Sequence, residues 1–295
     1  MYNNGQDVLR ICAQQNCSIA QLTLENEAEL TQRSIEDIRR QLDSYFQVMQ
    51  DACRQTLEHP VPSLSGLTSG DASRVNKYLL ERGGLCGGTL LRGIAYALSC
   101  FEVNTSMGLI VAAPTAGSCG ITPGAIIAAA EHCGATREQT LDALASAGCV
   151  GQIVTRNATV SGAEGGCQAE CGTAAAMAAA GIVQLLEGSP QQAFDAASIA
   201  FQNVMGLVCD PVAGLVEVPC AKRNAMGVAN ALVAADLALA GVGSFIPFDE
   251  VVEAMYRVGR AMPYTLRETA LGGLATTPTG LKAKGCVGAC GACSG

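Results

Sequence analysis

Long apolar segments rich in alanine alternate with short breaks rich in glycine from Lys77 onward. Strand-like alternation is scarce, and good helix formers outnumber runs of β-branched residues, so the apolar segments favour helices. Aromatic residues make up only 4% of the chain and Trp is absent, so the core must form by close approach of backbones. The pattern predicts a mainly α fold in a single helical domain, whose glycine-rich loops form a site.

Local signals divide the 295 residues into three parts. Residues 1–60 are expected to form an N-terminal helical extension, with a helix beginning near Ser34 and prolines at its end. Residues 61–281 are expected to form the main domain, and residues 282–295 a flexible, cysteine-rich tail. Within the main domain, the Ser189-Pro-Gln-Gln192 sequence predicts a helix running to about Val208, and a further helix is expected over 250–260.

Charge and hydropathy exclude two classes of partner. The net charge is −8 without a basic run, which argues against binding nucleic acid or an anionic membrane. The first residues are polar, so no secretory signal is indicated and a cytoplasmic location is expected. The longest apolar run, 225–246, is interrupted by Asn230 and Asp236, which suits a buried helix better than a membrane span.

Fifteen cysteines in a large acidic chain favour metal binding or buried thiols over a disulfide framework. Glycine, cysteine and polar residues gather in segments that let main-chain amides approach a ligand. These segments are 113–120, 162–171, 209–220 and 266–273. Three cysteines in them, Cys167, Cys209 and Cys220, are candidate ligands of an iron–sulfur cluster, because thiolates are its usual ligands. Their spacing lacks a compact pair, so buried structural thiols remain the alternative.

At these residues the chain resembles the alpha subunit of the iron–sulfur-dependent L-serine dehydratases, from the Ser65-Gly66 loop through Thr279-Gly280. The matching motifs are Ala113-Pro-Thr-Ala-Gly117, Gly162-Ala-Glu164, Gly166-Cys-Gln168, Cys209-Asp-Pro-Val-Ala-Gly214, Val218-Pro-Cys220 and Arg223-Asn224. The resemblance implies that Cys167, Cys209 and Cys220 hold a 4Fe–4S cluster with one open iron. It also implies conversion of L-serine to pyruvate and ammonia without pyridoxal phosphate.

Candidates for substrate binding follow from residue type and from the resemblance. The substrate carboxylate is expected on hydroxyls and amides of Thr115, Gly117 and Ser118, or on the loop that begins at Ser65. Asn157 is a further candidate, although it also begins an N-x-T sequon.

The general base is not identified in the chain. His59 and His132 are interpreted as structural residues, and the resemblance places the base on a separate beta subunit, the expected partner. The alpha chain thus looks like half of an enzyme.

Other readings compete with this one. A related cluster-dependent L-cysteine desulfidase would remove the thiol of cysteine instead of the hydroxyl of serine. A pyridoxal-phosphate enzyme is disfavoured because the chain has only four lysines, and none lies in a sequence setting suited to a Schiff base with that cofactor. An electron-transfer or scaffold protein would need all four ligands of its cluster filled.

The tail cysteines Cys286, Cys290 and Cys293 show the C-x3-C-x2-C spacing of radical S-adenosylmethionine enzymes. Those enzymes normally carry it early, after a first barrel strand, so a radical enzyme is not expected here. The tail either caps the open iron, as in some relatives, or carries adventitious thiols.

Overall fold

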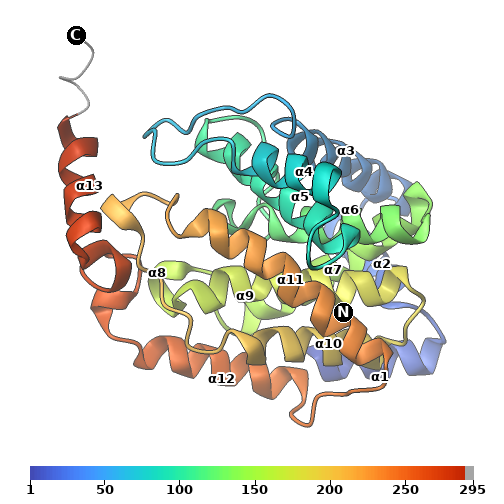
Figure 1. Cartoon of the computed structure of the whole chain (residues 1–295). Helices are drawn as coiled ribbons and strands as arrows, with labels where there is room; N and C mark the ends of the chain where they lie inside the picture. The colour runs from blue at the N-terminus through green and yellow to red at the C-terminus, as the bar shows by residue number, and fades with distance from the viewer. Residues whose placement is uncertain (290–295) are drawn as a thin grey trace.

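The computed structural model describes residues 1–289 and consists of helices joined by short loops (Figure 1). The N-terminal third contains α1 (Gly5–Gln15), α2 (Ile19–Thr31), α3 (Ile35–Arg54), α4 (Asp71–Arg82) and α5 (Gly88–Thr105). The remainder contains α6 (Ile121–Cys133), α7 (Arg137–Asn157), α8 (Gly162–Gly165), α9 (Cys167–Leu185), α10 (Pro190–Asn203), α11 (Cys220–Leu239), α12 (Phe248–Ala261) and α13 (Pro278–Ala289). Extended pairing within residues 1–289 is limited to two isolated bridges. The predicted mainly α, single-domain fold is confirmed.

Helix starts follow their local sequence signals. The Ser34 hydroxyl accepts a hydrogen bond from the Asp37 amide at the start of α3. Ser189 and Gln192 form a reciprocal capping box at the start of α10. This helix ends at Asn203, earlier than the sequence predicts, and Gly206 then adopts a φ of 87°. The chain turns there and leads directly into Cys209.

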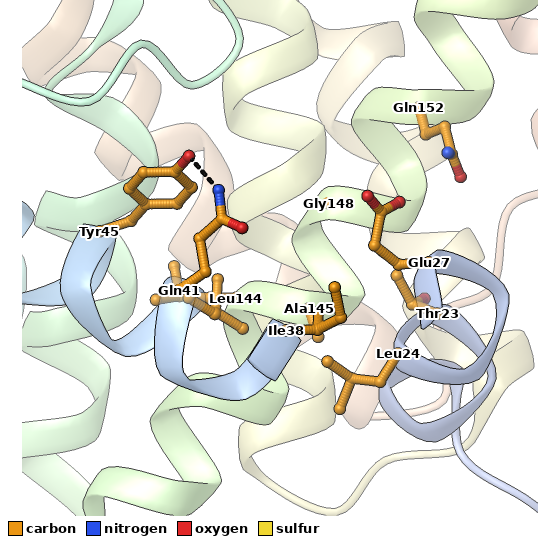
Figure 2. A pocket seen from close by; sticks show the side chains of 11 residues that line it. Thr23, Leu24, Glu27, Ile38, Gln41, Tyr45, Leu144, Ala145, Gly148 and Gln152 are labelled. Carbon is orange, nitrogen blue, oxygen red and sulfur yellow. Dashed lines mark hydrogen bonds between the residues drawn. The ribbon is translucent and has the colours of Figure 1, made fainter. Parts of the chain in front are cut away.

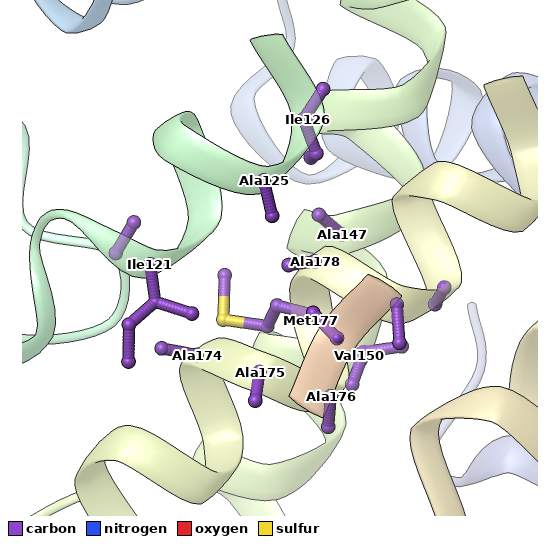
Figure 3. Close-up of a cluster of buried hydrophobic side chains, with 14 of the residues drawn as sticks. Ile121, Ala125, Ile126, Ala147, Val150, Ala174, Ala175, Ala176, Met177 and Ala178 are labelled. Atoms are coloured by element: carbon purple, nitrogen blue, oxygen red, sulfur yellow. The ribbon is translucent and has the colours of Figure 1, made fainter. Parts of the chain in front are cut away.

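Helix α9 is the centre of the core and packs against α6, α7, α10 and α11. Figure 3 shows alanines of α9 facing Ile121 and Ala125 of α6 and Val150 of α7. Small side chains are required here, because a Cβ on Gly181 would lie 2.7 Å from the Ala143 carbonyl oxygen. The expected close approach of backbones is therefore the packing principle of the domain.

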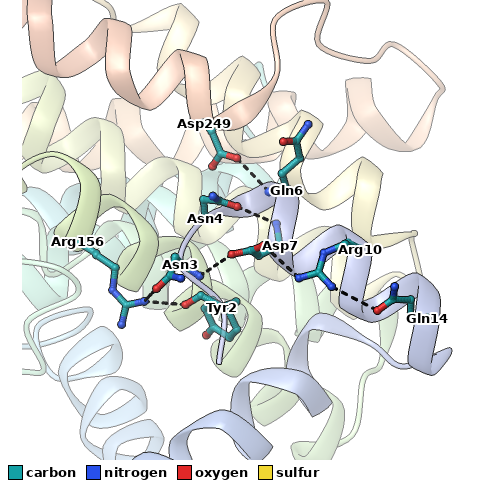
Figure 4. Close-up of polar contacts among 9 residues, drawn as sticks. All are labelled: Tyr2, Asn3, Asn4, Gln6, Asp7, Arg10, Gln14, Arg156 and Asp249. Carbon is teal, nitrogen blue, oxygen red and sulfur yellow. Dashed lines mark hydrogen bonds and ion pairs between the residues drawn. The ribbon is translucent and has the colours of Figure 1, made fainter.

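The first three helices share the main hydrophobic core, to which Val8, Cys12 and Phe46 contribute. Figure 4 shows how polar contacts fix the residues before α1. Arg156 donates to the Tyr2 carbonyl oxygen at 2.7 Å, and the Gly5 amide donates to Asp249 Oδ1 at 2.7 Å. The N-terminal region is consequently anchored to both α7 and α12.

A cavity of about 240 Å³ lies between α2, α3 and α7 (Figure 2). Its floor is apolar and includes Leu24, Ile38 and Ala145, while Glu27 lies at its edge. The cavity is lined by helices rather than by the glycine- and cysteine-rich loops.

The last helix, α13, includes residues 282–289, where the sequence predicts a flexible tail. Cys290, Cys293 and the side chain of Cys286 lie outside what the structure describes, so the capping hypothesis stays a prediction. Among the described residues, none of the helices has the length and apolarity required to cross a bilayer.

Candidate active site

The three candidate cysteines lie at the ends of elements that meet beside α9. Cys167 is the first residue of α9, Cys220 is the first residue of α11, and Cys209 lies in the loop after α10. Their exposed fractions are 2%, 5% and 4%. Each thiol is close enough to the others to affect their ionisation. The fold thus gathers the three cysteines in one buried region.

Backbone contacts fix the Cys209 loop. The Cys209 amide donates to the Leu266 carbonyl oxygen at 2.9 Å, and the Glu268 amide donates to the Cys209 carbonyl oxygen at 2.7 Å. Asp210 accepts from Arg223 at 2.8 Å and from the Leu274 amide at 2.7 Å. These bonds join the segment that begins at Cys209 to residues 266–274.

Gly162 keeps a space open beside Cys209. A Cβ on Gly162 would lie 3.2 Å from three atoms: Cys209 Sγ, Glu170 Oε2 and Glu268 Oε2. Gly117 borders the same carboxylate, because its Cβ would lie 2.6 Å from Glu170 Oε1. Both glycines therefore leave room where a thiol and two carboxylates converge.

The turn that contains Thr115, Gly117 and Ser118 is placed in this site. The Thr115 hydroxyl donates to Glu170 Oε1, and the hydroxyl oxygens of Thr115 and Ser118 lie 2.9 Å apart. Asn224 of α11 holds the turn by donating to the Gly117 carbonyl oxygen at 2.8 Å and accepting from the Gly120 amide at 3.0 Å. Three of the predicted substrate-binding residues thus lie together beside Glu170.

Ser65 reaches the same region through Glu217. Its hydroxyl donates to Glu217 Oε2 at 2.8 Å, and Thr68 donates to the same oxygen at 3.2 Å. Glu217 is buried and lies one turn before Cys220. The serine-rich loop is therefore attached to the segment that carries Cys220.

Asn157 has a different setting from the other candidates. It is the last residue of α7, and its side-chain amide donates to the Asn3 carbonyl oxygen at 2.8 Å and to that of Ile153 at 3.1 Å. The contact with Asn3 holds the N-terminal segment against α7, while the contact with Ile153 lies within the last turn of α7. The structure does not bring Asn157 into the hydrogen-bond network around Glu170.

Neither histidine joins that network. The Nδ1 atom of His132 lies 2.9 Å from the Thr89 hydroxyl, in the last turn of α6, at the end opposite Ser118. His59 is exposed in the turn after α3.

Three functional candidates were not identified from sequence. Glu170 and Cys171 lie on the first turns of α9, and the Sγ atoms of Cys167 and Cys171 are 3.3 Å apart. Arg223 has a 13% exposed side chain and lies close enough to Cys167 to influence its charge. The four-residue spacing of Cys167 and Cys171 was the available signal, since residues four apart share one face of a helix.

The surroundings affect the ionisation of the site in opposite directions. Burial and the neighbouring Cys167 raise the pKa of Cys220 to about 12, and burial and Cys167 also raise the pKa of Cys209. The hydrogen bond with Cys171, and then the charge of Arg223, lower the pKa of Cys167 against the effect of burial. Burial and the charge of Glu268 raise the pKa of Glu170, although its hydrogen bond from Thr115 opposes the shift. Burial and the neighbouring charge of Cys167 therefore disfavour the thiolate forms of Cys209 and Cys220.

The three cysteine thiols are compatible with an iron–sulfur cluster, because thiolates are its usual ligands. Among the side chains that the structure describes, residues 1–285, no three from His, Cys, Asp or Glu converge closely enough to hold one metal ion. A cluster has several irons, so its thiolates bind without meeting at one point. Cys167, Cys209 and Cys220 are three buried thiols of the kind that such a cluster binds.

Comparisons with known proteins agree on one family. The chain matches the family described as "Serine dehydratase alpha chain" over residues 14–275. It is 48% identical to the probable L-serine dehydratase, alpha chain, of Bacillus subtilis, over 95% of this chain and 93% of that protein. It is 46% identical to the L-serine dehydratase, alpha chain, of Peptoniphilus asaccharolyticus, over 96% and 97% of the two chains.

A longer relative matches over part of its length. The L-serine dehydratase of Haemophilus influenzae is 35% identical over 93% of this chain, but the match covers 61% of that protein. The longer protein therefore contains a region without a counterpart in this alignment.

Proposed function

The chain belongs to the serine dehydratase alpha chain family, and we propose that it is one subunit of an enzyme that converts L-serine to pyruvate and ammonia. The observation that carries the proposal is the convergence of three buried thiols with Thr115, Ser118 and Glu170. Such a site offers both a place for a metal cluster and polar groups for a small amino acid.

Cys167, Cys209 and Cys220 would hold a 4Fe–4S cluster. A cluster held by three protein thiolates supplies an iron that acts as a Lewis acid toward the substrate hydroxyl. The chain supports the ligands in specific ways. Asp210 and the 266–268 backbone fix Cys209, and the helix starts at Cys167 and Cys220 favour negative charge on sulfur.

The polar groups of the site suit a zwitterionic amino acid. Glu170 gives the site a carboxylate that Thr115 orients, and this charge favours the substrate ammonium. The hydroxyl of Ser118 and the main chain of the 115–118 turn are the candidates for the substrate carboxylate. Water is limited here because Ser118 and Gly117 are buried.

A beta subunit would complete the enzyme. Removing the α-proton of serine requires a base, and the two histidines of the chain lie in the turn after α3 and at the far end of α6. The additional region of the longer Haemophilus relative is where such a group would be carried in a single chain. We therefore assign the base to a separate subunit that covers the site.

Anaerobic reconstitution of the chain with and without its beta partner tests the proposal. We expect pyruvate from L-serine only when both chains and the cluster are present, with little product from L-cysteine. Full activity of the alpha chain alone would contradict the two-subunit arrangement. Faster turnover of L-cysteine than of L-serine would favour the desulfidase instead.

A further inference from the structure

Cys171 is a fourth buried thiol at the cysteine site. It follows Cys167 by one turn of α9, and its exposed fraction is 2%. The two Sγ atoms lie 3.3 Å apart, within hydrogen-bond distance for sulfur. Among the described side chains of residues 1–285, no hydrogen-bond partner is found for Cys209 Sγ or Cys220 Sγ, so Cys167 differs from the other two candidate ligands.

The chemistry of ligation fixes the direction of this hydrogen bond. A cysteine that binds iron does so as a thiolate and has no proton to donate. The proton between the two sulfurs must then belong to Cys171. A second thiolate beside the first would be a further buried negative charge, while the nearby cation, Arg223, is already paired with Asp210.

We propose that Cys171 is a positioning residue that donates its S–H hydrogen bond to the sulfur of Cys167 and so sets the reduction potential of the cluster. The inference rests on the proposed cluster but goes beyond the proposed reaction. A hydrogen bond to a ligand sulfur withdraws electron density and stabilises the reduced cluster, which raises the reduction potential. The effect is local to one of the three ligands, because the contact involves Cys167 alone.

Two substitutions separate this role from simple packing. Cys171→Ala removes the donor and leaves a small apolar side chain in the helix, whereas Cys171→Ser keeps a donor of similar size. Cys12→Ala is the matched control, since it removes a buried thiol from α1. All three are reconstituted anaerobically as the complete complex, and circular dichroism verifies that each variant is folded.

The measurement is a reductive titration of the cluster followed by electron paramagnetic resonance. We expect the same iron content in all proteins, a lower potential for Cys171→Ala, and a potential near that of the wild type for Cys171→Ser and Cys12→Ala. Equal potentials in the wild type and in Cys171→Ala would overturn the inference. Loss of the cluster from Cys171→Ala would also overturn it, because Cys171 would then be a ligand. A wild-type complex that binds no cluster would instead refute the proposed function as well.

Discussion

The Thr115 hydroxyl donates a hydrogen bond to the carboxylate of Glu170, 55 positions later in the chain. This contact joins the 113–120 turn to the first turns of α9, directly after Cys167. It places the Thr115 hydroxyl and the Glu170 carboxylate close to Cys167 in the first turn of α9. The contact is therefore the point at which the proposed cofactor site and the proposed substrate site meet.

Removing this contact is expected to weaken substrate binding without removing the cluster. Thr115→Ala leaves Glu170 without the hydroxyl that orients its carboxylate. A hydrogen bond between this carboxylate and the substrate ammonium would be worth about 1.5–3 kcal/mol, so its loss should raise KM for L-serine by about tenfold. Steady-state kinetics and the cluster absorbance of the same samples measure the two effects. Thr31→Ala, on an exposed helix end, is the control. An unchanged KM would remove Thr115 from the substrate site.

Gly162→Ala is expected to fill the space beside Cys209. The new Cβ would lie 3.2 Å from the Cys209 sulfur and from two carboxylate oxygens, so these groups must move apart. We expect a lower iron content and lower activity with little change in Tm, because the helical conformation of Gly162 accepts alanine. Iron analysis and thermal unfolding measure both quantities. Full iron content with full activity would contradict the importance of this space.

Two further glycines form a matched pair that tests the packing of the core. A Cβ on Gly120 would lie 2.2 Å from the Ala97 carbonyl oxygen, whereas a Cβ on Gly148 in α7 would meet no atom within 4 Å. Gly120→Ala should destabilise the fold by about 1–3 kcal/mol through overpacking. Gly148→Ala should stabilise it by roughly 0.5–1 kcal/mol because alanine favours the helix. Chemical denaturation distinguishes the two signs, and similar changes in both would contradict the predicted packing.

Asp71 is expected to make the free energy of unfolding decrease at acid pH. Burial would raise the pKa of Asp71, but hydrogen bonds from Lys222 and Arg74 outweigh burial and lower it. A carboxyl whose pKa is lower in the folded state stabilises the fold above its unfolded pKa, near 4. That stabilisation is lost as the pH falls below this value.

The comparison of wild type with Asp71→Asn isolates this effect. The difference in unfolding free energy should be largest near neutral pH and should decrease as the pH falls from about 4 toward 2. Denaturant titrations at several pH values measure it. A constant difference over that range would show that the ionised form of Asp71 does not stabilise the fold.

Local signals were sufficient to predict the starts of α3 and α10. Ser34, Ser189 and Gln192 act through bonds to residues three positions away, so sequence alone identifies them. The sequence predicts that α10 continues to about Val208, but the helix ends at Asn203. The turn at Gly206 that follows depends on the connection to the Cys209 loop.

Long-range contacts account for most of what sequence did not identify. Nothing near Glu170 in the sequence distinguishes it from a solvated helix residue, since its partner Thr115 comes from another loop. Asn157 illustrates the reverse case. It was a candidate for substrate binding, and its side-chain amide donates to the carbonyl oxygen of Asn3 at the start of the chain.

Mössbauer spectroscopy of the iron-loaded alpha–beta complex tests the central claim most directly, with and without L-serine. The account predicts a cubane in which one iron changes its signal when L-serine is added, and loss of that cubane when Cys167, Cys209 or Cys220 is replaced by serine. A cluster that survives all three replacements, or whose spectrum is identical with and without L-serine, would contradict it.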